Sequence, residues 1–270
     1  MKKKKRIFST IGMMFLVLFL YAPIIYTVIF SFNDSKSLTK FAGFSTRWYT
    51  KMLNDRTMTN AIFYTVVIAV IATAVSTIVG TLTAIGLSKS NRILRAVVEQ
   101  TNELPMMNPD IVTGIGLLMF FSALHLNKGF VTLLLAHIMF CIPYVILSVM
   151  PKLRSLDPNL AEAAMDLGAT PMQALVKVIV PQVLPGIVSG ALIAFTMSFD
   201  DFVISYFSTG NGVNNISIAV YTMRKRVNPS INALSTLVIV LITTALVLYN
   251  VASAISAKRR ARREKMIDQA

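Results

Sequence analysis

Three aspartates, Asp110, Asp200 and Asp201, lie within or at the start of long apolar runs of this sequence. An ionised carboxylate is costly in hydrocarbon, so acidic residues inside membrane segments usually face a water-filled route or a partner group. The apolar runs contain no Lys or Arg that could neutralise them. The adjacent pair, Asp200 and Asp201, is therefore predicted to line a route that attracts cations.

A structural role for the same pair stays open. Asp200 and Asp201 could form a structural unit in which one is protonated or caps a kink near Ser198 and Ser205. Asp200 follows Pro185 by about 15 residues, or roughly 22 Å of helix at the standard rise per residue. That distance places the pair past the midplane of a bilayer, toward its outer side.

Asp110 has two interpretations of equal weight. It follows Pro109 directly, so it is a candidate N-cap for a short helix as well as a candidate pathway residue. The apolar run after it, residues 111–123, is too short to cross a bilayer unaided. Together with Pro105, this pattern predicts irregular backbone at membrane depth, which is tolerated where protein or water covers it.

Aromatic rings near the acidic pair could add cation–π contacts worth about 0.5 to 2 kcal/mol each. Phe199 and Tyr206 flank the pair, and Trp48 lies in a loop whose spacing predicts a short amphipathic helix at the outer interface. Most rings of this chain are expected to pack, to face lipid or to form interfacial belts. Phe199, Tyr206 and Trp48 are the candidate contacts for a cation.

The composition is that of an integral membrane protein, because 55% of the residues are hydrophobic. The net charge of +14 comes from basic residues outside the apolar runs, clustered at both ends. They predict topology signals and contacts with anionic lipid, and no nucleic-acid partner is expected. The lone Cys141 excludes an intrachain disulfide, and His125 and His137 lack the spacing of metal ligands.

Six apolar runs are candidate spans, taking about 20 residues as one crossing. They cover residues 11–32, 61–87, 111–123, 130–150, 184–207 and 234–255. The first run lacks an obvious cleavage site and is expected to be retained. Six crossings put both termini on one side, and the bias of Lys and Arg places that side in the cytoplasm. We therefore expect a single membrane domain over 1–270: a basic N-terminus (1–10), an all-α six-helix bundle (11–255) and a basic tail (256–270).

A polar loop over residues 151–183 separates the fourth and fifth runs. Asp157 is a good N-cap, and Gly168 suits the left-handed position that ends a helix. Thr170 and Pro171 then repeat the pattern of a cap and a first helical residue, so a second helix is expected to run up to Pro181. The sequence thus predicts two helices joined by a glycine elbow on the cytoplasmic side.

The first helix of this loop has small residues and a pair of acids on one side. Glu162 and Asp166 lie one turn apart, where they could meet basic groups of a partner. Ala163 and Ala164 would let another backbone approach closely. An ordinary loop helix packed on the membrane surface fits the same residues, so both interpretations stay open.

The loop also carries a long motif. Glu162-Ala163-Ala164, then Gly168, then Val178-x-Val180-Pro181 resembles the E-A-A signature of permease subunits of ABC importers, with valines replacing its Ile and Leu. The resemblance implies a type I importer permease fold, in which this loop is a coupling helix that rests in a cleft of a separate ATPase. It assigns that role to Glu162, Ala163, Ala164, Asp166 and Gly168.

No G-x-x-x-x-G-K-[ST] phosphate loop occurs in the sequence, so no cofactor is expected in this chain and it is predicted not to be an enzyme itself. The resemblance implies that an ATPase dimer binds ATP and Mg on its behalf. It also places the chain in a bacterial cytoplasmic membrane.

A second resemblance concerns the cargo. The run from Ser198 to Ser205, the Trp48-Tyr49 pair and the stretch at residues 227–233 are similar to the polyamine importers, and to the second of their two permeases. This resemblance implies spermidine or putrescine as substrate. It further implies a heterodimer with another permease and an extracytoplasmic polyamine-binding protein.

Other functions are weighed against this one. A related permease could carry ferric iron, thiamine or phosphonate, although anionic cargo would fit poorly beside unpaired aspartates. An intramembrane enzyme could use Asp110 with Asp200 or Asp201 as an acid pair, but no H-E-x-x-H or other recognisable protease motif is present. A scaffold without transport would explain a docking loop and leave the carboxylates unexplained.

Overall fold

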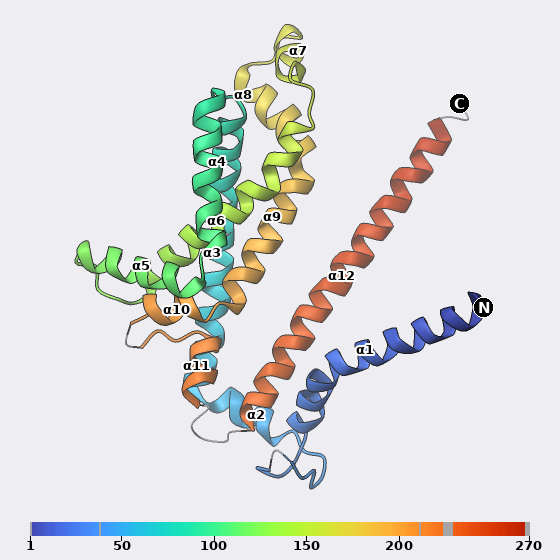
Figure 1. The fold of residues 1–270 in the computed structure, drawn as a ribbon, viewed down its shortest axis with the longest axis vertical. Helices are drawn as coiled ribbons and strands as arrows, with labels where there is room; N and C mark the ends of the chain where they lie inside the picture. Colours follow the sequence, from blue (N-terminus) through green and yellow to red (C-terminus); the bar gives the residue numbers. More distant parts are fainter. Residues whose placement is uncertain (1, 38, 211, 224–228, 268–270) are drawn as a thin grey trace. The chain divides into compact units, whose positions relative to one another are not determined.

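The computed structural model describes residues 2–37, 39–210, 212–223 and 229–267. Across these ranges every regular element is a helix, and the one β-type pairing is an isolated bridge between Asn33 and Phe44. The chain divides into two compact units (Figure 1), which we call the terminal unit (Met1–Arg56 with Met223–Ala270) and the central unit (Thr57–Thr222). The single domain expected from the sequence stays a prediction.

The described residues of the terminal unit form three helices. α1 (Lys2–Ser31) and α2 (Arg47–Asn54) both pack against α12 (Ser230–Ile267). α2 is the short amphipathic helix predicted in the first loop, and it buries Trp48 and Met52. The backbone of α12 stays helical through the basic tail as far as Ile267.

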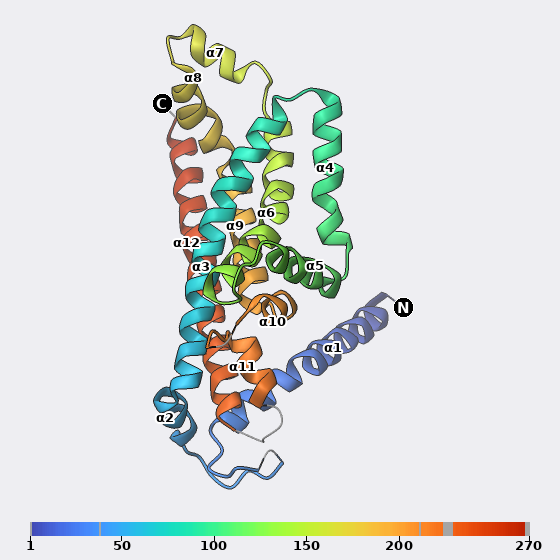
Figure 2. The same ribbon diagram turned by 90° about the vertical axis from the view of Figure 1, so that its left-hand side faces the viewer.

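The central unit contains the candidate sites. Its long helices are α3 (Arg56–Ser88), α6 (Phe130–Arg154) and α9 (Val180–Asp200), and α6 lies along α9 in both Figure 1 and Figure 2. The shorter elements, in chain order, are α4 (Arg92–Met107), α5 (Asp110–Ala123), α7 (Leu160–Asp166), α8 (Pro171–Ala174), α10 (Val203–Ser208) and α11 (Ile216–Met223). A five-residue π-helix, Leu175–Ile179, joins α8 to α9.

Small residues allow the close contact between α6 and α9. A Cβ atom at Gly190 would lie 3.2 Å from the Cα of Val145, and one at Gly186 would lie 3.0 Å from the carbonyl oxygen of Ser148. Glycine lets helices approach this closely, as is common in membrane bundles. The contact fixes α9 against α6 along the part of the bundle that leads to the acidic pair.

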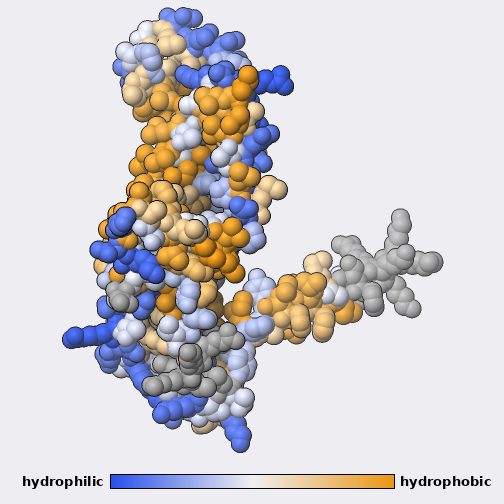
Figure 3. Space-filling model, turned by 60° about the vertical axis from the view of Figure 1, so that its left-hand side comes forward, coloured by the Kyte–Doolittle hydropathy of each residue, from blue (hydrophilic) through white to orange (hydrophobic). Residues whose placement is uncertain are grey.

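In the part of the chain that the structure describes, four helices are long and apolar enough to cross a membrane: Thr10–Ser31, Arg56–Ser88, Phe130–Arg154 and Pro171–Asp200. α4 and α5 count as a fifth crossing if taken together, although they meet at an angle of 108°. Ser230–Thr244 is a shorter apolar helix at the sixth predicted span. The outer surfaces of the helices of the central unit are hydrophobic, and Figure 3 shows them in orange below the more polar end that carries α7.

The sharp bend confirms the irregular backbone predicted around the third run. α4 ends at Met107 and α5 begins at Asp110, so the break falls at Asn108 and Pro109. Proline cannot donate a helical hydrogen bond, and it disfavours helical backbone in the residue before it. The two helices therefore change direction where the sequence placed Pro109.

Two expectations about the fifth span were wrong. The run predicted as continuous over 184–207 is broken after Asp200, where Asp201 is extended (φ −64°, ψ 130°) and α10 begins two residues later. Pro181 does not end the preceding helix either. The π-helix closes with the Val180 N–H bonded to the Leu175 carbonyl, and Pro181 then takes a first-turn position of α9, where its missing N–H costs little.

Candidate functional site

The predicted glycine elbow is present at the end of α7. Gly168 has φ +91°, in the left-handed region. Its N–H donates to the Met165 carbonyl at 2.8 Å, and the Ala169 N–H donates to the Ala164 carbonyl at 3.1 Å. This pair of bonds satisfies the last carbonyls of a helix in the arrangement that favours glycine. The elbow therefore has a defined geometry rather than a loose turn.

The N-terminus of α7 differs from the prediction. Asn159, not Asp157, is the N-cap residue, and its side chain makes no capping hydrogen bond. The Asp157 carboxylate instead accepts from the Asn159 N–H at 2.9 Å, two residues further along the chain. Aspartate often closes such a turn with its own side chain, and that turn precedes the helix.

The second helix of the loop begins as predicted at Thr170 and Pro171. The Thr170 hydroxyl accepts from the Gln173 N–H at 3.3 Å, and the Gln173 amide oxygen accepts from the Thr170 N–H at 3.0 Å. The sequence interpretation missed this reciprocal partner, although T-x-x-Q is a readable capping-box pattern. Two well-formed helix ends thus meet at Gly168 and Thr170.

The loop presents its candidate coupling residues to the outside. Glu162, Ala163, Asp166 and Gly168 are exposed, and Ala164 is partly exposed. Leu167, directly before the elbow, is 91% exposed. The Leu167 side chain therefore makes almost no contact within this chain.

A cavity of about 540 Å³ separates this loop from the helix ends beneath it. Its lining includes Ile85 of α3, Met150 of α6, Ala161 and Met165 of α7, and Leu175 of the π-helix. The loop therefore rests on the bundle over only part of its length.

At the acidic pair, Asp201 caps the short helix α10. Its Oδ1 accepts from the Ile204 N–H at 3.1 Å, and its Oδ2 accepts from the Ser205 N–H at 2.7 Å. The side chain is only 6% exposed. The N-cap position of α10 is Phe202, and from the residue before it the Asp201 carboxylate satisfies the orphan N–H groups of the second and third helical residues. The structural alternative weighed for the pair, a cap at a kink near Ser198 and Ser205, thus describes Asp201.

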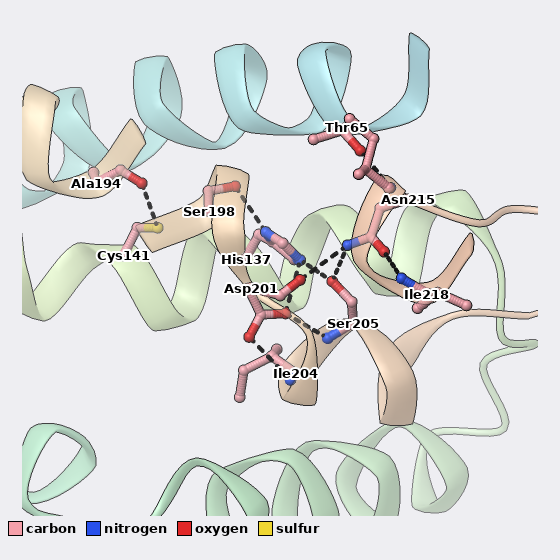
Figure 4. Close-up of polar contacts among 11 residues, drawn as sticks. Thr65, His137, Cys141, Ala194, Ser198, Asp201, Ile204, Ser205, Asn215 and Ile218 are labelled. Carbon is pink, nitrogen blue, oxygen red and sulfur yellow. Dashed lines mark hydrogen bonds and ion pairs between the residues drawn. The ribbon is translucent and has the colours of Figure 1, made fainter. Parts of the chain in front are cut away.

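His137 of α6 lies at the centre of a buried polar cluster around this cap (Figure 4). Its Nδ1 is 2.7 Å from the Ser198 hydroxyl, and its Nε2 is 2.9 Å from the Ser205 hydroxyl. The same Nε2 lies 3.6 Å from Oδ2 of Asp201. One imidazole therefore connects α6 to the end of α9 and to the start of α10.

The cluster continues toward α11 and α3. Asn215 donates from Nδ2 to the Ser205 hydroxyl at 2.7 Å and to the Asp201 carbonyl at 3.1 Å. Its Oδ1 accepts from the Ile218 N–H at 3.0 Å, and the Ile216 N–H donates to the Thr65 hydroxyl at 2.8 Å. Buried polar groups satisfied in this way fix one arrangement of the helices that meet there.

Sequence reasoning treated His137 as an ordinary polar residue and did not single out Asn215 or Thr65. The readable signal was the position of His137 in the middle of an apolar run, since an intramembrane polar residue needs a partner. The identity of its partners follows only from the packing of α6, α9 and α10.

Asp200 has different surroundings from its neighbour. It is the last residue of α9 and is exposed. Among the described residues it has no hydrogen-bond or ion-pair partner. The two adjacent carboxylates therefore differ: the Asp201 group is engaged inside the bundle, and the Asp200 group is free to meet a ligand.

Asp110 is exposed and is the first residue of α5, not its N-cap. The N-cap is Pro109, and no side chain caps this helix. The expectation that Asp110 caps the helix was therefore wrong, because the chain turns at Pro109, whose carbonyl accepts from the Val112 N–H at 2.9 Å. α5 packs against α10, and a Cβ at Gly114 would lie only 2.7 Å from the Phe207 ring.

The candidate aromatic residues fall into different environments. Phe199 stacks on Phe195 with 5.6 Å between ring centroids. Tyr206 is 50% exposed and forms edge contacts with Phe207 and Tyr221. Of the predicted rings of the central unit, Tyr206 offers the larger free surface.

Trp48 belongs to the terminal unit and is 2% exposed. Its indole N–H donates to the Asn33 carbonyl at 2.7 Å. The Arg47 guanidinium lies 4.5 Å from the ring centroid and the Lys51 ammonium 5.4 Å from it. Two cationic side chains of this chain therefore already lie over the Trp48 ring. A substrate contact at Trp48 stays a prediction.

Within the ranges that the structure describes, no group of three or more His, Cys, Asp or Glu could hold a metal ion. Cys141 is buried, with its sulfur 3.4 Å from the Ala194 carbonyl. Residues 227 and 228 of the third polyamine-like stretch lie outside the described residues.

Known proteins with similar sequences are permeases. The putrescine transport system permease protein PotI of Escherichia coli (strain K12) is 41% identical over 229 residues, which is 82% of each chain. The spermidine/putrescine transport system permease protein PotC of Haemophilus influenzae is 40% identical over 245 residues, which is 90% of this chain and 95% of that protein. These relatives confirm the resemblance to polyamine permeases.

The fold is also shared with solved importers. A crystal structure of a bacterial ABC transporter involved in the import of the acidic polysaccharide alginate aligns with a TM-score of 0.70, over 93% of this chain and 96% of that chain, at 18% identity. A structure of a bacterial alginate ABC transporter in complex with an alginate pentasaccharide-bound periplasmic protein aligns with a TM-score of 0.64. These matches confirm the all-α permease fold.

One family model matches most of the chain, and the matched part includes both the loop with the elbow and the acidic break. Residues 76–262 match the family described as binding-protein-dependent transport system inner membrane component. That range contains α6, the elbow at Gly168, α9 and Asp200. This multi-pass membrane protein belongs to the binding-protein-dependent transport system inner membrane components, the permease subunits of ABC importers.

Proposed function

We propose that this permease forms half of a translocation pathway for the polyamines putrescine and spermidine. The single observation that carries the proposal is the exposed carboxylate of Asp200 at the break between α9 and α10, in a chain whose relatives bear the names of polyamine permeases. A carboxylate without a partner among the described residues is suited to an ammonium group. Asp110 and Tyr206, both exposed, would add a second charge and a cation–π surface.

ATP hydrolysis would take place in a partner. The sequence has no phosphate loop, so ATP and Mg would bind to an ATPase dimer on the cytoplasmic side, where both termini of this chain would also lie. The exposed face of α7, with Glu162, Asp166 and Leu167, would rest on that ATPase. A second, different permease would complete the pathway, and an extracytoplasmic binding protein would deliver the polyamine.

In this mechanism, closure of the ATPases moves the two coupling loops toward one another. The helices then open to the outside, and the polyamine leaves its binding protein for the region around Asp200. Resetting of the ATPases opens the route inward. Because the second helix of the loop and α9 form one helical run, Pro171–Asp200, a movement passed from α7 across the elbow at Gly168 would reach the acidic break through that run.

The test is reconstitution of the full complex in vesicles with a binding protein. We expect putrescine or spermidine to stimulate ATP hydrolysis and to accumulate inside, and Asp200→Asn to raise the KM for the polyamine while basal ATPase activity stays unchanged. Stimulation by ferric iron, thiamine or a phosphonate instead would overturn the polyamine assignment and keep the permease. Peptide hydrolysis abolished by Asp200→Asn would favour the intramembrane enzyme.

A further inference from the structure

We infer that His137 is a positioning residue for polyamine recognition: it holds Ser198 and Ser205 on either side of the break and so keeps Asp201 in place as the cap of α10, which leaves Asp200 as the one carboxylate of the pair that contacts the substrate. This inference rests on the proposed function. It assigns different roles to two adjacent aspartates that look equivalent in the sequence, and it gives a role to a buried histidine that the transport mechanism above does not use.

The engagement of Asp201 is the first step. Both of its oxygens accept backbone N–H groups, from Ile204 at 3.1 Å and from Ser205 at 2.7 Å, and its side chain is 6% exposed. Because the carboxylate is buried, it would have to turn outward to contact a polyamine, which would break these bonds and leave two buried N–H groups without a partner. The loss of a buried hydrogen-bond partner is unfavourable, so Asp201 is retained by the protein.

The second step is the place of Asp200. It ends α9, and the next residue is extended, with ψ 130°. Successive residues at the end of a helix point about 100° apart, because the helix has 3.6 residues per turn. Asp201 is held inside the bundle, and Asp200, one residue earlier, points to a different side and is exposed. The cap on α10 thus determines where the free carboxylate points.

The third step is the bridge made by His137. The Asn215 amide is oriented by the Ile218 N–H, which donates to its Oδ1, so Nδ2 donates to the Ser205 hydroxyl. The Ser205 hydroxyl proton is then available for Nε2 of His137, and the Nδ1–H of the ring is left to donate to Ser198. Every group in this arrangement has a partner.

Through this bridge α6 fixes both sides of the break. Ser198 lies on α9 before the break and Ser205 lies on α10 after it, and one ring holds both hydroxyls. α10 has six residues, too few to keep its own direction without tertiary contacts. Removal of the imidazole should therefore change the direction of Asp200 while leaving its charge intact.

The experiment compares conservative and charge-neutralising variants in the reconstituted complex, with putrescine and spermidine as substrates. Asn keeps one acceptor oxygen for the backbone N–H groups and Ala keeps none, so Asp201→Asn should raise the KM less than Asp201→Ala does. Asp200→Asn removes a charge-assisted contact and should raise the KM by about 10- to 100-fold.

Variants of His137 test the bridge itself. Gln can place a polar atom near the position of Nε2 and Asn near that of Nδ1, so His137→Gln should keep the link to Ser205 and transport better than His137→Asn. His137→Leu should raise the KM without lowering the maximal rate in proportion. Thr196→Val, at an exposed position of α9, is the matched control and should change neither value.

The outcomes are distinguishable. Equal increases of KM in Asp200→Asn and Asp201→Asn, or an unchanged KM in all His137 variants, would overturn this inference and leave the proposed function standing. A wild-type complex that polyamines do not stimulate would overturn the proposed function and this inference with it. If His137→Leu fails to assemble, the comparison of Asp200→Asn with Asp201→Asn decides alone.

Discussion

Nε2 of His137 lies 3.6 Å from Oδ2 of Asp201, and both side chains are almost fully buried, 2% and 6% exposed. His137 lies on α6 and Asp201 in the break after α9, and Ser205 contacts both: its hydroxyl bonds to His137 and its backbone N–H donates to Asp201. The position of the acidic break is therefore fixed by tertiary contacts with α6. It is the point where α6 controls the direction of the chain between α9 and α10.

Ser205→Ala should destabilise the central unit. The change removes the hydroxyl that both His137 and Asn215 use, so two buried polar groups lose a partner, at a cost of about 1 to 3 kcal/mol. Thermal unfolding in detergent would show a lower Tm. Thr196→Ala removes a hydroxyl on exposed α9 that bonds only to its own helix, and it should leave the Tm almost unchanged.

Substitution of Gly168 should damage coupling in proportion to the strain it introduces. At φ +91° a β-branched residue is strongly disfavoured, and a left-handed residue other than glycine costs about 1 to 2 kcal/mol. Gly168→Val should therefore lower polyamine-stimulated ATP hydrolysis more than Gly168→Asn, since Asn tolerates this backbone. Gly86→Ala, with open space around its Cβ, is the control. Equal activity of the two Gly168 variants would contradict a role for the elbow geometry.

Glu162→Lys should weaken binding of the ATPase without affecting insertion. Glu162 is exposed on α7 and has no partner among the described residues, so the protein itself loses little when its charge is reversed. Co-purification of the ATPase would measure the effect. Glu103→Lys reverses an exposed charge on α4 and should retain the ATPase. Full retention by Glu162→Lys would place the docking surface elsewhere.

Leu167→Ser should separate docking from stability. The side chain is 91% exposed and buries almost nothing in this chain, so the free energy of unfolding should change by less than about 0.5 kcal/mol. Affinity for the ATPase should fall if this leucine lies in the interface. Leu133→Ala, at a fully buried position, should by contrast cost about 2 to 5 kcal/mol. A large loss of stability in Leu167→Ser would show that the leucine packs within the protein.

Much of the membrane architecture could be read from the sequence. Apolar run length located the helices that cover 61–87, 130–150 and all but the last residue of 11–32, because backbone groups in hydrocarbon are satisfied only within a helix. Gly168, Thr170 and Pro171 could be assigned for a similar reason, since each occupies a backbone position that few residues favour.

The arrangement at the acidic break could not be predicted in this way. Hydropathy treats 184–207 as one span, because a helix broken by a side-chain cap has the same composition as a continuous one. The Asp201 side chain forms the cap. The cap is held in place by His137, which is distant in sequence and bonds to Ser205. Only the packing of α6 against α9 brings the two together.

The helical run Pro171–Asp200 has the elbow at one end and the free carboxylate at the other. Its 30 residues span about 45 Å at the standard rise per residue. On the proposed function, one end of this run lies next to the surface that binds the ATPase, and the other end carries the carboxylate that binds the cargo. A movement of a few ångströms at the ATPase would then displace the Asp200 carboxylate, which is the counter-ion of the polyamine, through the helix itself.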